Sequence, residues 1–400
     1  MALLSVDEAL ARVLNGLAPL EAEQVDIGDS YGRVLAADLT ATLTQPPFAA
    51  SAMDGYAVRG TDVATLPATL ELIGEAAAGA GFTGTLGPGQ AVRIFTGAPV
   101  PDGADTIAIQ ENTEERGGQV VVKEAAPGRY VRPRGQDFED GQVLLERGAR
   151  LGPRALMLAA SANHAELAVI RKPTVAILAT GDEIVPPGSD LGPDQIVSSV
   201  GYGLAGLVQA QGGEAVNLGI AKDDRESIVT LAHTGAGADI LVTIGGASVG
   251  ERDLVANALR GEGLEVDFAK VAMRPGKPVL YGRLGSQRFL GLPGNPVSAL
   301  ICAQVFLVPM LRRMLGLPGE TRSLLEAVLG EALPVNGDRR HYIRATSTWR
   351  KDGTRVVRAL PSQDSSLVAA FTRADCLILR APQAPASPEG AAVKIIPFSD

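Results

Sequence analysis

The strongest constraint on the fold is an alternation of strand-like and helix-like segments between residues 172 and 317. We expect strands at residues 174–179, 215–219, 239–244, 279–281 and 289–292, and helices at residues 199–211, 225–233 and 253–259. Such alternation is typical of a mostly parallel sheet with helices on both faces. Because ligands of these sheets bind at the carboxyl ends of the strands, any site is expected at that edge.

The longest apolar stretch of the chain, residues 297–311, is predicted to be a buried helix of the same domain. Asn295 and Pro296 stand before it as an N-cap and a first-turn proline. The stretch contains Gln304 and Pro309 and falls short of the ~18 to 20 apolar residues that a membrane span needs.

Three further segments have a readable pattern. Residues 5–17 begin with a capping box at Ser5 and continue as an amphipathic helix. From about residue 66 to 150, short strand-like runs alternate with glycine and proline clusters, and Gly117-Gly118 predicts a hairpin, so we expect a barrel-like β domain. Near the C-terminus, residues 342–349 and 354–359 flank a second hairpin turn and predict a small β domain.

Composition excludes several classes of function. The chain has 36 Lys and Arg against 45 Asp and Glu, and this net charge of −9 disfavours a nucleic-acid or anionic membrane surface. Cys302 and Cys376 supply neither a disulfide framework nor a metal cluster. Three histidines without ligand spacing leave little for zinc or Ser-His-Asp chemistry. Carboxylates, hydroxyls, backbone amides, Lys and Arg must therefore carry any reaction.

Polar loops that contain glycine follow three of the expected strands, at residues 180–183, 245–253 and 293–296. Glycines let backbone amides approach an anion, and a helix that begins just after the loop favours phosphate. Each loop alone is also compatible with a simple turn. Their coincidence at one edge of a parallel sheet favours a phosphate site.

Charged residues accompany these loops. Asp182, Glu183, Asp224 and Asp253 fall at the same edge, and carboxylates beside phosphate are typical ligands of Mg²⁺. Residues 274–277 add fixed positive charge suited to phosphate or an oxyanion. The combination predicts metal-assisted chemistry on a phosphorylated ligand. Purely structural roles stay open, because Asp253 also suits a helix start and Asp182 a loop cap.

Residues 201–206 match G-x-G-x-x-G, the dinucleotide-binding fingerprint. The preceding residues 189–195 are polar and contain Pro and Gly, whereas a true fingerprint follows a buried strand. We therefore interpret these glycines as positions of close helix packing. Pro278 follows Lys277, so no P-loop motif is present there and a P-loop ATPase is disfavoured.

Several motifs spread over nearly the whole chain resemble those of the molybdopterin molybdenumtransferase family, which includes the C-terminal E domain of gephyrin. They lie, in the family's order, at residues 51–58, 96–101, 180–183, 245–250, 274–278 and 291–298. The resemblance implies a transferase of molybdenum cofactor biosynthesis that inserts molybdate into adenylylated molybdopterin and releases AMP with Mg²⁺. It also implies an elongated homodimer of four-domain subunits, with molybdopterin adenylyltransferase as the donor of the substrate.

By motif position, the resemblance implies functional roles for individual residues. Asp54, Thr96 and Asp137 are expected to act across the dimer interface, together with the catalytic residues Glu183 and Lys277. The expected Mg²⁺ ligands are Glu183, Asp224 and Asp253. The expected substrate-binding residues are Gly181, Asp182, Gly245, Gly246, Ser248, Gly250, Arg274, Pro293, Gly294, Asn295, Ser298, Arg344 and Ser365.

The sequence departs from the commonest family pattern at three positions. Arg274 stands where Lys is usual, Gln136 where Glu is usual and Ala247 where Val is usual. Arginine keeps the charge but changes the donor geometry. Two other functions stay open: a homologue that inserts tungstate, which is a tetrahedral dianion of nearly the same size as molybdate, and a non-catalytic pterin-binding scaffold.

The predicted architecture is α/β plus all-β. Residues 1–20 and 170–320 are expected to form the α/β molybdopterin-binding domain, residues 21–44 and 142–169 a stalk, residues 45–141 an inserted β-rich domain and residues 321–400 a C-terminal β domain. A stalk can bury its apolar side only against a partner, which is a second reason to expect a dimer. The first residues lack the features of a secretory signal, so we expect a cytoplasmic protein without nucleic-acid or membrane partners.

Overall fold

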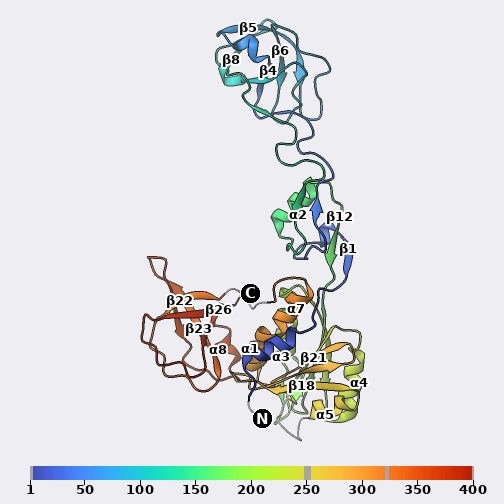
Figure 1. Cartoon of the computed structure of the whole chain (residues 1–400), viewed down its shortest axis with the longest axis vertical. Coiled ribbons are helices and arrows are strands. Elements are labelled where there is room, and N and C mark those ends of the chain that lie inside the picture. Colours follow the sequence, from blue (N-terminus) through green and yellow to red (C-terminus); the bar gives the residue numbers. More distant parts are fainter. Residues whose placement is uncertain (1–2, 247–253, 320–323, 399–400) are drawn as a thin grey trace. The chain divides into compact units, whose positions relative to one another are not determined.

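The computed structural model describes residues 3–246, 254–319 and 324–398, and the chain forms two compact units (Figure 1). The first unit contains residues 1–23 and 170–400, and the inserted unit contains residues 24–169. The chain therefore passes between the units twice. Both passages lie in a two-stranded sheet of β1 (Ala22–Asp26) and β12 (Glu166–Ile170).

A six-stranded sheet forms the centre of the α/β domain in the first unit. Its order is β16 (Glu214–Ala221), β13 (Thr174–Thr180), β17 (Ile240–Ile244), β21 (Gln287–Leu292), β20 (Pro278–Leu284) and β18 (Leu264–Lys270). The first four strands are parallel neighbours, and β20 alone runs against the others because it is antiparallel to both β21 and β18, which confirms the predicted, mostly parallel sheet. The sequence analysis did not predict β18, because Glu265 and Asp267 interrupt its apolar residues at the edge of the sheet.

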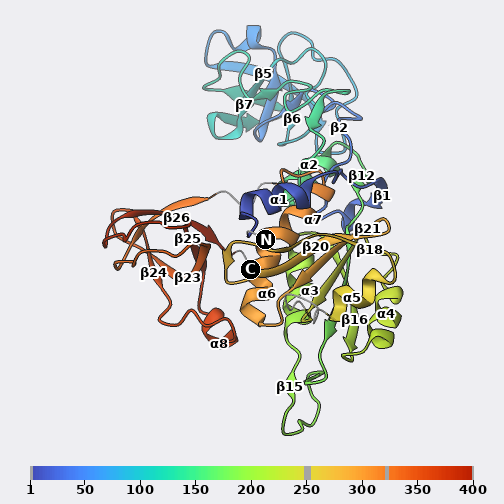
Figure 2. The same cartoon turned by 60° about the horizontal axis from the view of Figure 1, so that its bottom comes forward.

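Strand β13 shows why the sheet is covered on both faces. Val175, Ile177 and Ala179 belong to one hydrophobic cluster, with buried residues of α1 (Val6–Leu14), α3 (Val200–Ala210) and α6 (Pro296–Cys302). Ala176 and Leu178 belong to a second cluster, with α4 (Arg225–Thr234) and α5 (Leu254–Arg260), which lie together beside the sheet in Figure 2. Because successive side chains of a strand point to opposite faces, the apolar run is buried throughout.

The predicted apolar helix consists of α6, a π-helical turn at Ala303–Leu307 and α7 (Val308–Met314). Over Pro296–Met314 it is long and apolar enough to cross a membrane, but 83% of the tested window is buried inside the protein. It is the core helix that the sequence predicted. Asn295 occupies the N-cap position as expected, yet its side chain makes no capping bond.

Helix α1 begins as predicted, because the Ser5 hydroxyl accepts a hydrogen bond from the Glu8 amide at 3.2 Å. Its apolar face packs on the sheet of the α/β domain. The Tyr281 hydroxyl donates to the carbonyl of Val13 at 3.0 Å and accepts from Arg288 at 2.9 Å. The N-terminal helix is thus tied to the sheet by polar as well as apolar contacts.

The C-terminal part of the first unit is a second six-stranded sheet. Its order is β19 (Met273–Arg274), β23 (Arg340–Trp349), β24 (Arg355–Ala359), β22 (Leu325–Leu329), β26 (Ala392–Pro397) and β25 (Cys376–Arg380), and β25 also pairs with β23. The hairpin between β23 and β24 is confirmed by the pairing of Trp349 with Arg355. Strand β19 belongs to the segment that leads into the α/β sheet, so Arg274 lies where the two domains meet. A short helix, α8 (Val368–Phe371), follows β24.

The inserted unit is built around a third sheet. Its order is β7 (Thr106–Ile109), β4 (Gly55–Val58), β6 (Gln90–Ile94), β5 (Ala68–Ala76), β9 (Gln119–Val122) and β8 (Thr113–Arg116). The predicted hairpin is confirmed, since Gly117 and Gly118 have φ values of 58° and 81° and join Arg116 to its partner Gln119. The unit also contains α2 (Pro153–Ser161) and the strand pairs β2 (Leu39–Thr40) with β11 (Val143–Leu145) and β3 (Ala50–Ser51) with β10 (Val131–Arg132).

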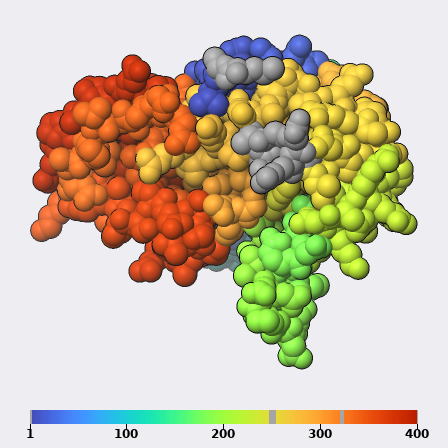
Figure 3. Space-filling model, turned by 90° about the horizontal axis from the view of Figure 1, so that it is seen from below, coloured from blue at the N-terminus to red at the C-terminus, as the bar shows by residue number. Residues whose placement is uncertain are grey.

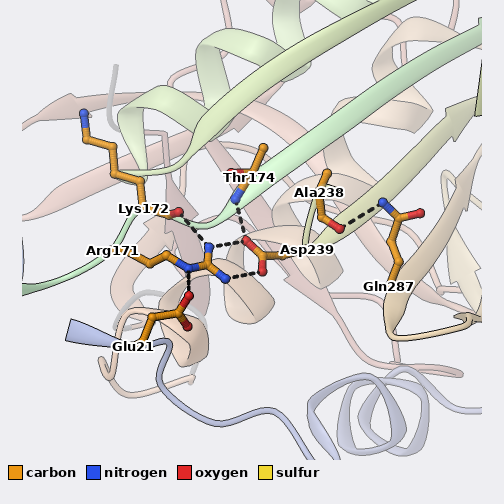
Figure 4. A network of polar contacts seen from close by, with 7 residues as sticks. All are labelled: Glu21, Arg171, Lys172, Thr174, Ala238, Asp239 and Gln287. Carbon is orange, nitrogen blue, oxygen red and sulfur yellow. Dashed lines mark hydrogen bonds and ion pairs between the residues drawn. The ribbon is translucent and has the colours of Figure 1, made fainter. Parts of the chain in front are cut away.

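A polar network fixes the two passages of the chain to the α/β sheet (Figure 4). Arg171 donates to both carboxylate oxygens of Asp239 at 2.7 Å and, through Nε, to Glu21. The amide of Thr174 donates to the same Asp239 carboxylate at 2.8 Å. Burial alone would raise the pKa of Asp239, but the hydrogen bonds from Arg171 and Thr174 lower it below its ordinary value. Asp239 is therefore an ionised anchor.

Removal of this anchor tests its contribution to stability. We expect Arg171→Met to lower the free energy of unfolding of the first unit by about 2 kcal/mol, because a largely buried carboxylate loses its partner. A carboxylate with a lowered pKa stabilises the fold above its unfolded pKa, about 4, and ceases to do so as the pH falls. The difference from the unmodified protein should therefore shrink below pH ~4. Urea unfolding followed by circular dichroism at both pH values measures it.

Arg116→Met is the matched control, because Arg116 pairs with Glu114 on the surface with 71% of its side chain exposed. Its effect should stay below about 0.5 kcal/mol. Equal effects of the two substitutions would contradict an anchoring role for Arg171.

Candidate functional site

The structure brings the three predicted loops together at the carboxyl edge of the α/β sheet. The amide of Gly181 donates to the carbonyl of Ala221 at 3.3 Å, and the amide of Gly245 donates to the carbonyl of Leu292 at 3.2 Å. A Cβ atom on Gly294 would lie 3.7 Å from the Cα of Gly245. The ends of all four parallel strands are therefore in direct contact.

Gly246 shows why this edge is lined by backbone. Its φ is 65°, and a Cβ atom there would lie 2.4 Å from a methyl carbon of Val255. Only glycine fits such a position without displacing the helix behind it. The residues that follow, including the predicted Ser248, Gly250 and Asp253, lie outside the described residues.

Acidic side chains gather beside these loops. Asp182 and Glu183 are exposed, and the Glu183 carboxylate lies over Gly181, where a Cβ atom would be 2.5 Å from its Oε2. The amide of Asp223 donates to Oδ1 of Asp182 at 3.1 Å. Partial burial, followed by the charges of Asp182 and Glu183, raises the pKa of Asp223. The three residues form an acidic cluster in which the charges of Asp182 and Glu183 repel that of Asp223.

Asp223 was not among the predicted residues, whereas its neighbour Asp224 was. The structure gives Asp224 a structural bond, because its Oδ1 accepts from the amide of Ser227 at 2.8 Å and caps helix α4. The two aspartates that follow β16 thus have different roles. One side chain caps the next helix and the other joins the acidic cluster.

Within residues 3–246, 254–319 and 324–398, no three Asp, Glu, His or Cys side chains converge into a ready-made metal site. Mg²⁺ commonly uses only one or two carboxylates, with waters and substrate phosphates as its other ligands. The acidic cluster has the hard oxygen donors and the excess negative charge that suit this kind of binding. Its donor chemistry fits Mg²⁺ in company with a phosphorylated ligand.

Lys277 approaches the same edge from the antiparallel strand β20. Lys277 directly precedes β20, and the pairing of Leu280 with Gly291 carries it to the end of the sheet where Gly294 lies. A Cβ atom on Gly276, whose φ is 97°, would lie only 2.1 Å from Sγ of Cys302. The loop of Arg274 and Lys277 therefore rests directly on helix α6.

Arg344 is a buried cation of the C-terminal β domain. Its side chain is 2% exposed, and neither Nη atom has a hydrogen-bond partner. Burial lowers the pKa of Arg344, the charge of Asp364 raises it, and that of Arg274 lowers it. Burial and then the charges of Arg274 and Arg344 lower the pKa of His341 to about 4. Arg274 and Arg344 form a positive cluster, and the buried Nη donors of Arg344 lack an acceptor.

The predicted residues Asn295, Ser298 and Ser365 lie at the start of helix α6. The Asn295 side-chain amide donates to the Ser365 hydroxyl at 2.9 Å, and the Val297 amide donates to the Ser365 carbonyl at 3.1 Å. Ser298 is buried in the first turn, and Pro293 is buried just before it. The C-terminal β domain thus contacts the loop after β21.

A pocket of about 420 Å³ opens at the β13 and β16 end of the site. It is lined by Gly181 and Asp182 and by three residues that the sequence analysis missed: Lys222, Asn217 and Tyr202. Its outer wall belongs to residues 184–197, the arm that contains β14 (Ile184–Val185) and β15 (Ile196–Val197) and appears as the green projection of Figure 3.

The glycines of the G-x-G-x-x-G match lie in helix α3 and do not follow a buried strand. A Cβ atom on Gly203 would lie 3.0 Å from Leu300 of α6, which confirms the packing interpretation there. At Gly206 that interpretation is wrong, since a Cβ atom would meet nothing within 4 Å.

In the inserted unit, Asp54 and Thr96 form a closed pair. The amide and the hydroxyl of Thr96 both donate to Oδ1 of Asp54 at 2.7 Å, and these two bonds lower the pKa of Asp54. Asp137 lines a separate pocket of about 520 Å³, to which Gly97 and Arg132 also contribute. The segments at residues 51–58, 96–101 and 132–137 therefore meet within this unit.

Three family models match the chain. They are described as "MoeA N-terminal region (domain I and II)" at residues 4–163, "Probable molybdopterin binding domain" at residues 176–313 and "MoeA C-terminal region (domain IV)" at residues 326–398. Together they cover almost all of both units.

Curated relatives and solved structures agree with these matches. The molybdopterin molybdenumtransferase of Haemophilus influenzae is 33% identical over 99% of each chain, and that of a Nostoc species is 36% identical over 85% of this chain and 81% of its own. A crystal structure of a molybdopterin biosynthesis MoeA protein from Pyrococcus horikoshii covers 100% of both chains, with a TM-score of 0.85 and 32% identity. The chain therefore belongs to the molybdopterin molybdenumtransferase family, the transferases of molybdenum cofactor biosynthesis.

Proposed function

We propose that this protein inserts molybdate into adenylylated molybdopterin and releases AMP with the help of Mg²⁺. The observation that carries the proposal is the convergence of three glycine-bearing loops with an acidic cluster at one edge of the sheet, around Gly181, Gly245 and Gly294. Backbone amides suit the phosphates of the substrate, and clustered carboxylates suit the cation that accompanies phosphate.

The phosphoanhydride of the substrate would lie along these loops. Its hydrolysis forms a bond from a water oxygen to one phosphorus, while the bridging oxygen leaves on the other, so AMP and molybdopterin separate. We assign Glu183 the role of orienting this water, since its carboxylate lies over Gly181. Around Pro293, Gly294 and Gly246, backbone N–H groups would contact the phosphates.

Mg²⁺ would be held between the phosphates and the acidic cluster of Asp182, Glu183 and Asp223, with Asp224 and Asp253 as the further ligands that the resemblance implies. When bound, the cation neutralises charge that develops on the phosphate oxygens. Burial raises the pKa of Asp223 first, and the charges of Asp182 and Glu183 raise it further, so without the cation this charge is uncompensated. The protein's part is therefore to hold several carboxylates close together before the cation arrives.

Molybdate, as the second substrate, would bind to Arg274, Lys277 and Arg344, with hydroxyls such as those of Ser365 and Ser298 nearby. The unpartnered Nη donors of Arg344 support this assignment, because a buried guanidinium requires an acceptor. His341 is neutral at physiological pH, since its pKa is about 4, so the positive charge comes from Arg and Lys.

We also propose that Asp54, Thr96 and Asp137 of one subunit complete the site of its homodimer partner. Molybdopterin adenylyltransferase is the expected donor of the adenylylated pterin, and the cytoplasm is the expected compartment. The support is the family membership together with the gathering of the segments of Asp54, Thr96 and Asp137 within the inserted unit.

A single-turnover assay tests the reaction. Adenylylated molybdopterin, Mg²⁺ and molybdate should give molybdate-dependent AMP release, and Asp54→Ala should slow it at least about a hundredfold. Glu124→Ala, an exposed acidic residue of the same unit, is the control and should leave the rate unchanged. Binding of the pterin without AMP release, with molybdate or with tungstate, would contradict the proposal and favour a scaffold.

Subunit mixing tests the cross-dimer site. Asp54→Ala and Glu183→Ala proteins should each be inactive, but a mixture that has exchanged subunits should recover about a quarter of the activity, because half of the dimers each regain one of two sites. Light scattering should give about twice the chain mass of 41.3 kDa. No recovery after proven exchange would show that both residues act within one subunit.

The acidic cluster is expected to affect both the stability of the protein and its binding of Mg²⁺. Asp223→Asn should raise the melting temperature at neutral pH and weaken Mg²⁺ binding, since one repelling charge is removed. A carboxyl whose folded pKa is raised destabilises the fold only once it ionises, so the gain should vanish below pH ~4. Calorimetry with and without Mg²⁺ measures both effects.

Asp224→Ala is the contrasting variant, because loss of the α4 cap should cost about 1 kcal/mol at neutral pH. If Asp223→Asn is equally destabilising, the residue has a structural role and the cluster does not store repulsion.

A further inference from the structure

Arg93, on β6 of the inserted unit, has no role in the proposed reaction so far. Its guanidinium group is enclosed by Gly55, Tyr56, Phe95 and Gln110, which we call its cradle. Its guanidinium carbon lies 4.9 Å from the ring centroid of Tyr56 and 5.1 Å from that of Phe95. Nη2 donates to the side-chain oxygen of Gln110 at 2.8 Å, and Nη1 donates to the carbonyl of Gly55 at 3.4 Å. Two aromatic contacts and two hydrogen bonds leave the group little freedom.

Each residue of this cradle is connected to Asp54. Gly55 and Tyr56 follow it in the chain, and the amide of Gln110 donates to the Asp54 carbonyl at 3.0 Å. Phe95 immediately precedes Thr96, which binds the Asp54 carboxylate through two donors. Arg93 therefore joins, through one rigid group, all three segments that determine where this carboxylate lies.

The charge of Arg93 also acts on Asp54. The hydrogen bonds of Thr96 lower the pKa of Asp54 first, and the charge of Arg93 lowers it further. The other charged groups that face the cradle are acidic: Glu115 accepts from the Tyr56 hydroxyl at 2.9 Å, and Glu111 accepts from the Gln110 side chain at 3.5 Å. Arg93 is thus the cation that offsets a negatively charged neighbourhood.

We propose that Arg93 is a positioning residue for Asp54, which it acts on by fixing the segments of Gly55, Phe95 and Gln110. The inference rests on the proposed role of Asp54 in the transferase reaction. Arginine suits the task because its planar group stacks on rings and donates in two directions, whereas lysine has charge without the plane. Methionine has a side chain of similar apolar bulk but has neither the charge nor the planar donor group.

The test compares Arg93→Met, Arg93→Lys and the unmodified full-length chain by two independent measurements. The first is hydrogen–deuterium exchange of the peptide that contains the Thr96 amide. The second is the pH profile of single-turnover AMP release. Arg116→Met, which removes an exposed arginine of the same sheet, is the control and should change neither.

In the Arg93→Met protein, the Thr96 amide should exchange roughly tenfold faster, and AMP release should be roughly tenfold slower with KM for the pterin unchanged. The acidic limb of the pH profile should move to higher pH. Arg93→Lys should restore the position of the acidic limb, because it restores the charge, but only part of the amide protection. If Arg93→Met does not fold, Arg93→Lys alone decides, since its partial loss of protection is specific to the stacked geometry.

Unchanged exchange in Arg93→Met, or in Arg93→Lys where only that variant folds, would overturn the proposal. A raised KM with an unchanged rate constant would also overturn it, because Arg93 would then contact substrate directly. Failure of the proposed function is separable: the unmodified protein would release no AMP, while the exchange measurement would still report whether Arg93 holds Asp54 and Thr96.

Discussion

The bond between Arg171 and Asp239 is the constraint on which the arrangement of the first unit depends (Figure 4). Asp239 stands directly before β17 and Thr174 begins β13, so the anchor lies at the amino edge of the sheet. Both passages of the chain to the inserted unit are secured there. The loops of the candidate site lie at the opposite, carboxyl edge of the sheet.

At that carboxyl edge the protein keeps unfavourable contacts. Asp182, Glu183 and Asp223 repel one another, and the buried donors of Arg344 lack an acceptor. A fold selected for stability alone would neutralise both features, because uncompensated charge and unpaired polar groups are costly. In the proposed function, the acidic cluster would bind a cation and Arg344 would bind an oxyanion.

The parts of the fold that local sequence determines were predictable. Buried parallel strands such as β13 and β17 are continuous apolar runs, and the hairpin at Gly117-Gly118 needs residues with positive φ. The edge strand β18 was missed because charged residues alternate with its apolar ones. At the site, the roles of Asp54 and Arg344 came from a family resemblance and not from their surroundings. The side-chain bond from Asn295 to Ser365 and the cradle of Arg93 depend on partners distant in sequence, which no local pattern reveals.

The contact of Gly276 with Cys302 gives the loop of Arg274 and Lys277 a built-in reporter. The thiol is fully buried under the loop, and burial raises its pKa, so it stays protonated and shielded from reagents while the loop is seated. Access to this sulfur requires the segment of Arg274 and Lys277 to lift from helix α6. The rate at which an alkylating reagent modifies Cys302 therefore measures how often that loop separates from helix α6. A ligand that binds the loop and holds it closed would lower this rate.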